Sequence, residues 1–270
     1  MSKKTLDLNP LNSDEMIKPS ELIEIKGTGH LTLQDRRVFN ALVQNAWGGD
    51  LGIAGKWFSI STGELRDTTE RNTRLTDSLE RLMRTICVVT LKNGTEMRVA
   101  MLSTNKLTTT ENTGILEYTF PVDFAELLKN STIFAKLDLA VMKSFSSKYA
   151  FALYESVSRR VNQRWKYTET LTLDELRDIL GVEEGKHTSY KNLNKVAIQP
   201  ALTEVNSITP YQVSIVPQKK GRAIGSVILG WNYKDEGGMK AAFKELNASK
   251  TGRKARLENK GETVVETGSR

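Results

Sequence analysis

The sequence predicts an α+β fold in which two tandem winged-helix domains are followed by a basic, mostly disordered C-terminal tail. Three observations lead to this prediction: the length, a short internal repeat, and the same order of helical and strand-like patterns around each repeat copy. At about 100–200 residues per domain, 270 residues favour two domains, each large enough to bury its own core. The repeat is "ISTGELRD" at Ile60–Asp67 and "LTLDELRD" at Leu171–Asp178, and in each copy a Ser or Thr can cap a short helix.

The first half begins with a helix, because apolar residues recur at helical spacing through "LTLQDRRVFNALVQNAW". The strand-like "KWFSI" leads into the first repeat copy, and "RNTRLTDSLERLMRTI" then carries a second helical stripe. Two strand-like runs follow in "ICVVTLKNGTEMRVAML", with Asn93-Gly94 as a strong hairpin signal between them. Helix, strand, helix, helix, strand, turn, strand is the order of a helix-turn-helix with a β-hairpin wing.

The second half repeats this order. A helix in "SKYAFALYESVSRRV" precedes the strand-like "WKYTETLTL" and the second repeat copy. A further helix in "SYKNLNKVAI" precedes two strands, "YQVSIVPQKKGRAIGSVILGW", which turn at Gly221. Pro200 predicts a kink or a new helix start, because proline lacks an N–H group and pushes Gln199 out of the helical region.

The predicted organisation has four parts: an N-terminal extension (1–30), winged-helix domain 1 (31–135), winged-helix domain 2 (136–234) and a basic tail (235–270). No Pro/Gly-rich linker separates the two domains, so we expect them to be closely coupled. From Gly237 to Arg270 the chain has eight basic and four acidic residues and loses its apolar periodicity. This composition predicts disorder, with some helix near Met239–Leu246.

Composition favours a polyanionic partner. Lys and Arg total 39 against 32 for Asp and Glu, which gives a net charge of +7. The pI of about 9.3 suits a nucleic-acid-binding protein, although the same charge also occurs in proteins with no such partner. The only cysteine, Cys87, excludes an intramolecular disulfide and a cysteine cluster, and its strand pattern predicts a core position. No apolar run reaches the roughly 18 residues of a membrane helix and no secretory signal begins the chain, so we expect a cytoplasmic protein without a membrane partner.

The chemistry of known enzymes is missing from the sequence. "GVEEGKH" has one residue too few between its glycines for a phosphate-binding loop, and His187 stands where a hydroxyl is required. "GDLGIAGKW" fails as well, because Asp50 replaces the first glycine and Trp57 the hydroxyl. His30 and His187 do not form the His-x-His pair of a nickase, and neither lies in a nucleophile motif. The sequence therefore predicts a binding protein that is not an enzyme and needs no metal or other cofactor.

Three stretches of the sequence resemble a known protein family. "SSKYAFALYESVSRR", "LTLDELRDILGV" and "YKNLNKVAIQPALTEVN", followed by a basic hairpin, resemble the initiator replication proteins of iteron-containing plasmids. The resemblance is clearest over residues 145–233 and extends weakly back to residue 31 through "STGELRD" and "LERLMR". It implies two winged-helix domains that bind direct repeats in origin DNA as monomers, help to open the duplex and recruit host helicase and initiator proteins. It also implies a homodimer that represses its own promoter.

The predicted DNA-binding residues fall in three groups. If Tyr190, Leu193, Val196 and Ala197 face inward, an outward surface without acidic residues remains on the second helix of domain 2. Lysine and asparagine on such a surface suit phosphates and base edges, although a solvated basic face is the plainer interpretation. The residues predicted to contact DNA are Lys186, Thr188, Lys191, Asn192, Lys195 and Gln199 on this helix, Lys219, Lys220 and Arg222 in the wing, and Arg74, Arg81 and Arg84 in domain 1.

The domain 1 group stays ambiguous, since Glu70, Asp77 and Glu80 lie among its arginines and can pair with them. That face fits DNA or another partner equally well. Three rivals to the initiator remain: a winged-helix transcription regulator without an origin role, a nuclease or nucleotide hydrolase, and a structural adaptor whose positive charge is incidental.

Overall fold

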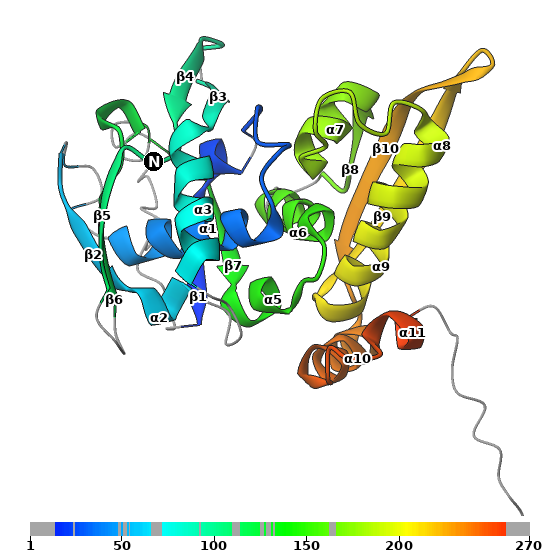
Figure 1. Cartoon of the computed structure of the whole chain (residues 1–270). Helices are drawn as coiled ribbons and strands as arrows, with labels where there is room; N and C mark the ends of the chain where they lie inside the picture. Colours follow the sequence, from blue (N-terminus) through cyan, green and yellow to red (C-terminus); the bar gives the residue numbers. More distant parts are fainter. Residues whose placement is uncertain are drawn as a thin grey trace, which may run out of the picture.

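The computed structural model describes residues 14–257, apart from residues 24, 48–49, 51–52, 54, 66–71, 92, 110–113, 125–126, 128–130, 132 and 162–165. Figure 1 shows two mixed helix-and-strand units lying side by side, each with a β-hairpin that projects from the body. The first unit contains β1 (Glu15–Pro19), the 3-10 turn η1 (Ser20–Leu22), α1 (Leu33–Ala46), β2 (Phe58–Ser61), α2 (Thr62–Leu65), α3 (Asn72–Arg84), β3 (Ile86–Thr90), β4 (Glu96–Ala100), β5 (Thr104–Thr109), β6 (Gly114–Thr119) and β7 (Phe134–Asp138).

The second unit follows directly. It contains α5 (Leu139–Ser144), α6 (Lys148–Arg160), β8 (Thr168–Thr172), α7 (Leu173–Leu180), α8 (Tyr190–Leu193), the π-helical turn η2 (Asn194–Ile198), α9 (Gln199–Ile208), β9 (Tyr211–Lys220), β10 (Ala223–Tyr233), α10 (Glu236–Asn247) and α11 (Arg253–Leu257). The helices and hairpins predicted around each repeat copy are present, and the mixed α+β composition is confirmed.

The short helix of the second repeat copy follows the predicted capping chemistry. α7 begins with a capping box, in which the Thr172 hydroxyl accepts from the Glu175 N–H and the Glu175 carboxylate accepts from the Thr172 N–H. α7 ends at Gly181, whose φ of +63° suits a residue without a Cβ. α1 starts in the same way, with Thr32 as the cap and Asp35 as its acidic partner.

The two units pair their strands differently. In the second unit β8, β10 and β9 form one antiparallel sheet in that order, so the strand before the short helix pairs with the wing. Among the described residues of the first unit, the wing strands β3 and β4 pair with each other, and a single bridge joins Lys26 to Val88. There β2 pairs with β6, and β6 pairs with β5, a strand that the polar sequence "TNKLTT" did not lead us to expect.

Part of the predicted N-terminal extension is built into the first unit. β1 pairs antiparallel with β7, and Met16 and Leu22 are buried in the core. From Glu15 onward the extension is part of the fold, because Met16 and Lys18 of β1 are buried beside α1 and β7. The predicted limits between the two domains stay a prediction.

The predicted tail is also folded in part. Residues 236–257 form α10 and α11 instead of a disordered segment, and the helix expected near Met239–Leu246 lies within α10. Ala242 is buried, and the buried Arg253 guanidinium donates to the carbonyl of Ser144 and to the carboxylate of Glu245. These contacts with the rest of the protein thus override a composition that is polar on average. Residues 258–270 lie outside the described residues.

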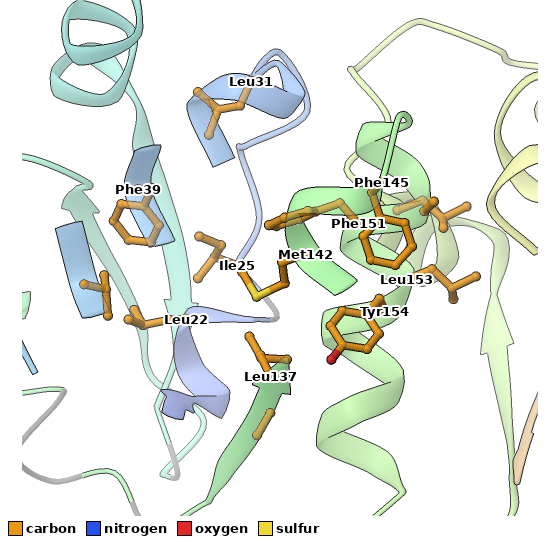
Figure 2. Packing of buried hydrophobic residues seen from close by; sticks show 14 of the residues in the cluster. Leu22, Ile25, Leu31, Phe39, Leu137, Met142, Phe145, Phe151, Leu153 and Tyr154 are labelled. Carbon is orange, nitrogen blue, oxygen red and sulfur yellow. The ribbon is translucent and has the colours of Figure 1, made fainter. Parts of the chain in front are cut away.

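One continuous core joins the two units. Figure 2 shows Ile25 and Leu137 of the first unit close to Met142 of α5, with Phe151 and Tyr154 of α6 beyond it. Buried polar bonds cross the same junction: Lys18 Nζ lies 2.7 Å from Glu155 Oε1 and 2.8 Å from Asn40 Oδ1. Burial lowers the pKa of Lys18, and the Glu155 carboxylate partly offsets this effect. Gly29 approaches the second unit so closely that a Cβ there would lie 2.7 Å from the Val182 carbonyl oxygen.

Candidate nucleic-acid interface

A single long helix carries the main predicted surface. α8, η2 and α9 follow one another without a break from Tyr190 to Ile208, and the Ser189 hydroxyl caps the start by accepting from the Asn192 N–H. Pro200 stands at the start of α9, which agrees with the predicted alternative of a new helix start, but Gln199 keeps helical angles instead of leaving the helical region. The π-helical turn explains this: the Gln199 N–H donates to the Asn194 carbonyl, five residues back, so the chain reaches Pro200 on an altered bonding pattern.

The same turn changes which residues face the core. Leu193 and Ala197 are buried as predicted, and Tyr190 is partly buried. Val196, predicted to face inward, is 38% exposed, whereas Ile198 is fully buried. A π turn contains an extra residue, so the apolar stripe shifts by about one position after Asn194 relative to an ideal helix.

The outward face matches the prediction in exposure. Within the part of the chain that the structure describes, the lysines of this face make no ion pair with a carboxylate, and no acidic residue occurs between Gly185 and Ile198. The Gln199 side chain donates to the Asn194 side chain at 3.2 Å, which keeps both on the helix surface. All six predicted residues of this group are exposed: Lys186, Thr188, Lys191, Asn192, Lys195 and Gln199.

The wing supplies a second basic element. β9 and β10 pair over their full length, from Tyr211 with Tyr233 to Lys220 with Ala223 at the tip. Gly221 and Arg222 form the two-residue turn, and the φ of +66° at Gly221 is one that glycine adopts without strain. The predicted residues Lys219, Lys220 and Arg222 are all exposed. Beyond the end of β8 this hairpin projects as two strands only (Figure 1).

The loop before the helix is held by residues that the sequence analysis did not select. Arg177 on α7 donates from Nη1 to the His187 carbonyl at 2.8 Å and from Nη2 to the Lys186 carbonyl. His187 has a φ of +49°, and its ring lies between the Tyr149 hydroxyl and the Asn192 amide. The repeated motif ELRD was the available signal, since Arg177 is its arginine; the matching Arg66 lies outside the described residues.

The arginines of the first unit do not form a comparable surface. Arg81 makes two bonds to Asp35, at 2.8 and 2.9 Å, and so ties α3 to the start of α1. Arg84 lies 3.3 Å from Glu80 and Arg74 is exposed, while the acidic Glu70 lies outside the described residues. This bidentate bond means that the Arg81 guanidinium already holds a buried carboxylate, and its contact with DNA stays a prediction.

Other predicted features are structural. Cys87 is fully buried, its Sγ lies 3.2 Å from the Val99 carbonyl oxygen, and burial raises its pKa to about 11, as expected for a core thiol. His30 lies 2.9 Å from the Thr85 hydroxyl. Within the described residues, no three His, Cys, Asp or Glu side chains converge as a metal site requires. The helices described are also too short or too polar to cross a bilayer.

Comparison with known proteins agrees with this geometry. A family model described as "Initiator Replication protein, WH1" matches residues 15–158, and one described as "Initiator Rep protein, WH2" matches residues 172–231. A replication initiation protein from Escherichia coli is 29% identical over 115 residues, which are 42% of this chain and 35% of that protein. The match thus spans about a third of that relative's length. With two units of winged-helix type, each found by its own family model, the chain belongs to the initiator replication protein family.

Proposed function

We propose that the protein initiates plasmid replication by binding repeated DNA sequences at the origin, and that its second winged helix reads the bases. The observation that carries this proposal is the exposed, acid-free face of α8–α9, which leads into the cationic wing. Membership of the initiator replication protein family supports the role, as does the name of the E. coli relative. Plasmid DNA would place the protein in the bacterial cytoplasm.

The residues on this face have different tasks. Asparagine can form two hydrogen bonds with adenine in the major groove, so we assign base reading to Asn192. Lysines neutralise phosphates wherever these lie, so we assign backbone contact to Lys191 and Lys195. The remaining contacts that we propose are Lys186, Thr188 and Gln199 near the helix, and Lys219, Lys220 and Arg222 in the wing.

The direct test replaces the base-reading residue. Asn192→Ala should weaken binding to the preferred site by about 1–3 kcal/mol and flatten the preference at one base position. Fluorescence anisotropy with the preferred site and its single-base variants measures both effects. Lys240→Ala is the matched control, because this exposed lysine lies on α10, at the far end of α9 from α8 (Figure 1), and should leave affinity unchanged. If a folded variant with alanine at Lys191, Asn192 and Lys195 binds as tightly as the parent, the helix is not the reader.

A selection from random DNA distinguishes the proposal from its rivals. Enrichment of tandem repeats, followed by opening of an adjacent duplex, supports an origin-binding initiator. A single preferred site without opening would instead favour a winged-helix transcription regulator. Turnover of DNA or nucleotide that depends on metal or ATP would indicate an enzyme, and binding without any sequence preference would indicate an adaptor.

We further propose that the free protein forms a homodimer that represses its own promoter, that DNA repeats favour monomers, and that bound monomers recruit host helicase. These three properties are implied by the family resemblance. Sedimentation with and without repeat DNA tests the first two. A free protein that stays monomeric at every concentration contradicts the dimer, and helicase that fails to associate with the protein on origin DNA contradicts recruitment.

A further inference from the structure

Three side chains from separate elements form a short chain of contacts at the start of the reading helix. His187 Nδ1 lies 3.3 Å from Asn192 Nδ2, and His187 Nε2 lies 3.4 Å from the Tyr149 hydroxyl of α6. Tyr149 and His187 are partly buried, whereas Asn192 is exposed. The base-reading side chain of the proposed function is thus connected to the protein body through a single imidazole ring.

The backbone fixes the position of that ring. His187 adopts a φ of +49°, a conformation that few residues other than glycine tolerate, although asparagine and histidine are among them. Arg177 maintains it by donating to two successive carbonyls, those of Lys186 and His187. The guanidinium fork therefore holds the loop at both residues, and the ring is placed before any DNA is bound.

The contacts then determine which ring nitrogen faces the Asn192 amide. The Asn192 Nδ2 group faces His187 Nδ1, and because an amide N–H can only donate, Nδ1 accepts in this arrangement. The other ring nitrogen, Nε2, faces the Tyr149 hydroxyl. Asn192 is left with its Oδ1 acceptor and one N–H donor, the pair that adenine N6–H and N7 require.

We propose that His187 is a positioning residue that orients the Asn192 amide and so sets a preference for adenine at the base that Asn192 reads. Arg177 holds the loop, and the Tyr149 hydroxyl contacts the other nitrogen of the ring. The inference rests on the proposed function, because it matters only if Asn192 faces a base. It assigns specificity to a residue that makes no DNA contact of its own.

The test uses a pair of variants that separate the acceptor from the backbone conformation. His187→Asn keeps a side-chain acceptor near the Nδ1 position and tolerates a positive φ, whereas His187→Gly tolerates the same φ and has no acceptor. Both are measured as the full-length protein, after thermal unfolding shows that they are folded. Binding is compared on the preferred site and on the three base changes at the position that Asn192→Ala identifies.

The parent should prefer adenine at that position by about 5- to 150-fold, which corresponds to 1–3 kcal/mol. His187→Gly should lose most of this preference and keep its salt dependence, and combining it with Asn192→Ala should add little. His187→Asn should retain most of the preference, and Tyr149→Phe should lose part of it. If His187→Gly does not fold, Tyr149→Phe tests the inference through its expected partial loss of adenine preference.

Several results would overturn the inference. A His187→Gly protein that still prefers adenine as strongly as the parent shows that Asn192 orients itself. A lower salt slope in His187→Gly shows that His187 contacts phosphate directly. If Asn192→Ala changes no base preference while the parent is sequence-specific, Asn192 is not the reader; a parent with no preferred sequence refutes the proposed function itself.

Discussion

The two winged-helix units use similar sequence patterns to build surfaces of different charge. On α3, Arg81 bonds to Asp35 and Arg84 lies beside Glu80, so carboxylates of the same unit already neutralise these two arginines. On α8 and η2, Lys191 and Lys195 form no ion pair within the described part of the chain. A cation helps to bind a polyanion only where its charge is not already paired. Basic residue counts alone therefore do not distinguish a DNA-reading helix from one that is held in place by ion pairs.

The two units also differ in how their sheets support the wing. In the second unit β8 pairs with β10, which anchors the long wing to the sheet of its own unit. In the first unit β2 pairs with β6, and the wing of β3 and β4 stands apart as a two-stranded hairpin. The second wing is therefore supported by a third strand, β8, for a DNA contact at its tip. In the first unit the corresponding strand, β2, belongs to a separate sheet.

The largest effects on the free energy of unfolding should come from the cores, where α3 and α8 each bury a leucine at the same place in the repeat. Leu82 and Leu193 occupy the same place in the repeat and are 0% and 1% exposed. Leu82→Ala and Leu193→Ala should each lower the free energy of unfolding by about 2–5 kcal/mol, because each leaves a cavity. Urea unfolding followed by circular dichroism measures this. A loss below about 1 kcal/mol at either site would mean that its helix is not packed as described.

The next effect separates the ion-paired Arg81 of α3 from Lys195 of η2. Arg81→Ala should lower the free energy of unfolding by about 1–3 kcal/mol, since it strands the buried Asp35 carboxylate. DNA affinity of the folded variant should stay unchanged. The exposed Lys195 makes no such bond, so Lys195→Ala should leave stability nearly unaltered. Weaker DNA binding by stable, folded Arg81→Ala protein would return this residue to the interface.

Asp35 also predicts how stability depends on pH. Burial alone would raise its pKa, but hydrogen bonds from Arg81, Ser78 and Thr32 outweigh burial and lower it. Its contribution to stability is therefore present above the unfolded-state pKa of about 3.9 and is lost as the pH falls through the lower folded-state value. Asp35→Asn should flatten this part of the stability profile in acid. An unchanged acid profile would show that the Arg81 bond adds nothing to stability.

A smaller effect concerns phosphate contacts. The affinity of the parent should fall by orders of magnitude between low and physiological salt. Lys195→Ala and Lys220→Ala should each weaken binding to all sequences alike and lower the salt slope by about 1. Arg84→Ala in the first unit should change the slope less, because Glu80 already shares its charge. Equal changes from all three variants would remove the contrast between the units, and binding that is flat over this salt range would contradict the DNA-binding assignment.

The smallest effect tests whether α3 touches DNA at all. The Arg84–Glu80 pair is largely exposed and should contribute only about 0.2–1 kcal/mol to stability, so Glu80→Gln should leave the fold intact. If α3 lies against DNA, the change removes a repelling carboxylate, frees Arg84 and tightens binding slightly. Unchanged affinity, measured at low salt where such effects are largest, would indicate that this face serves another partner.

Local patterns in the sequence predicted the order of the elements around each repeat copy, both hairpins and the acid-free face from Gly185 to Ile198. These features are local: helical periodicity, a capping residue or a turn glycine acts within a few residues of its own position. The exposure of Lys191, Asn192 and Lys195 could be predicted in this way, because buried Leu193 and Ala197 fix the opposite side of the helix. The folded parts of the predicted extension and tail could not, since their apolar residues are few and become informative only beside β7 and α9.

The partners of charged groups and of strand edges are set by how the chain folds in space. Arg81 finds Asp35 at a separation of 46 residues, and no local pattern marks that pair in advance. The π-helical turn that exposes Val196 and buries Ile198 replaces the helical bonding that periodicity assumes. The contacts of His187 with Tyr149 and Asn192 likewise join a loop to two different helices. The energy of an ion pair or hydrogen bond depends on the distance between its atoms in space, whereas local sequence patterns show only how far apart residues are along the chain.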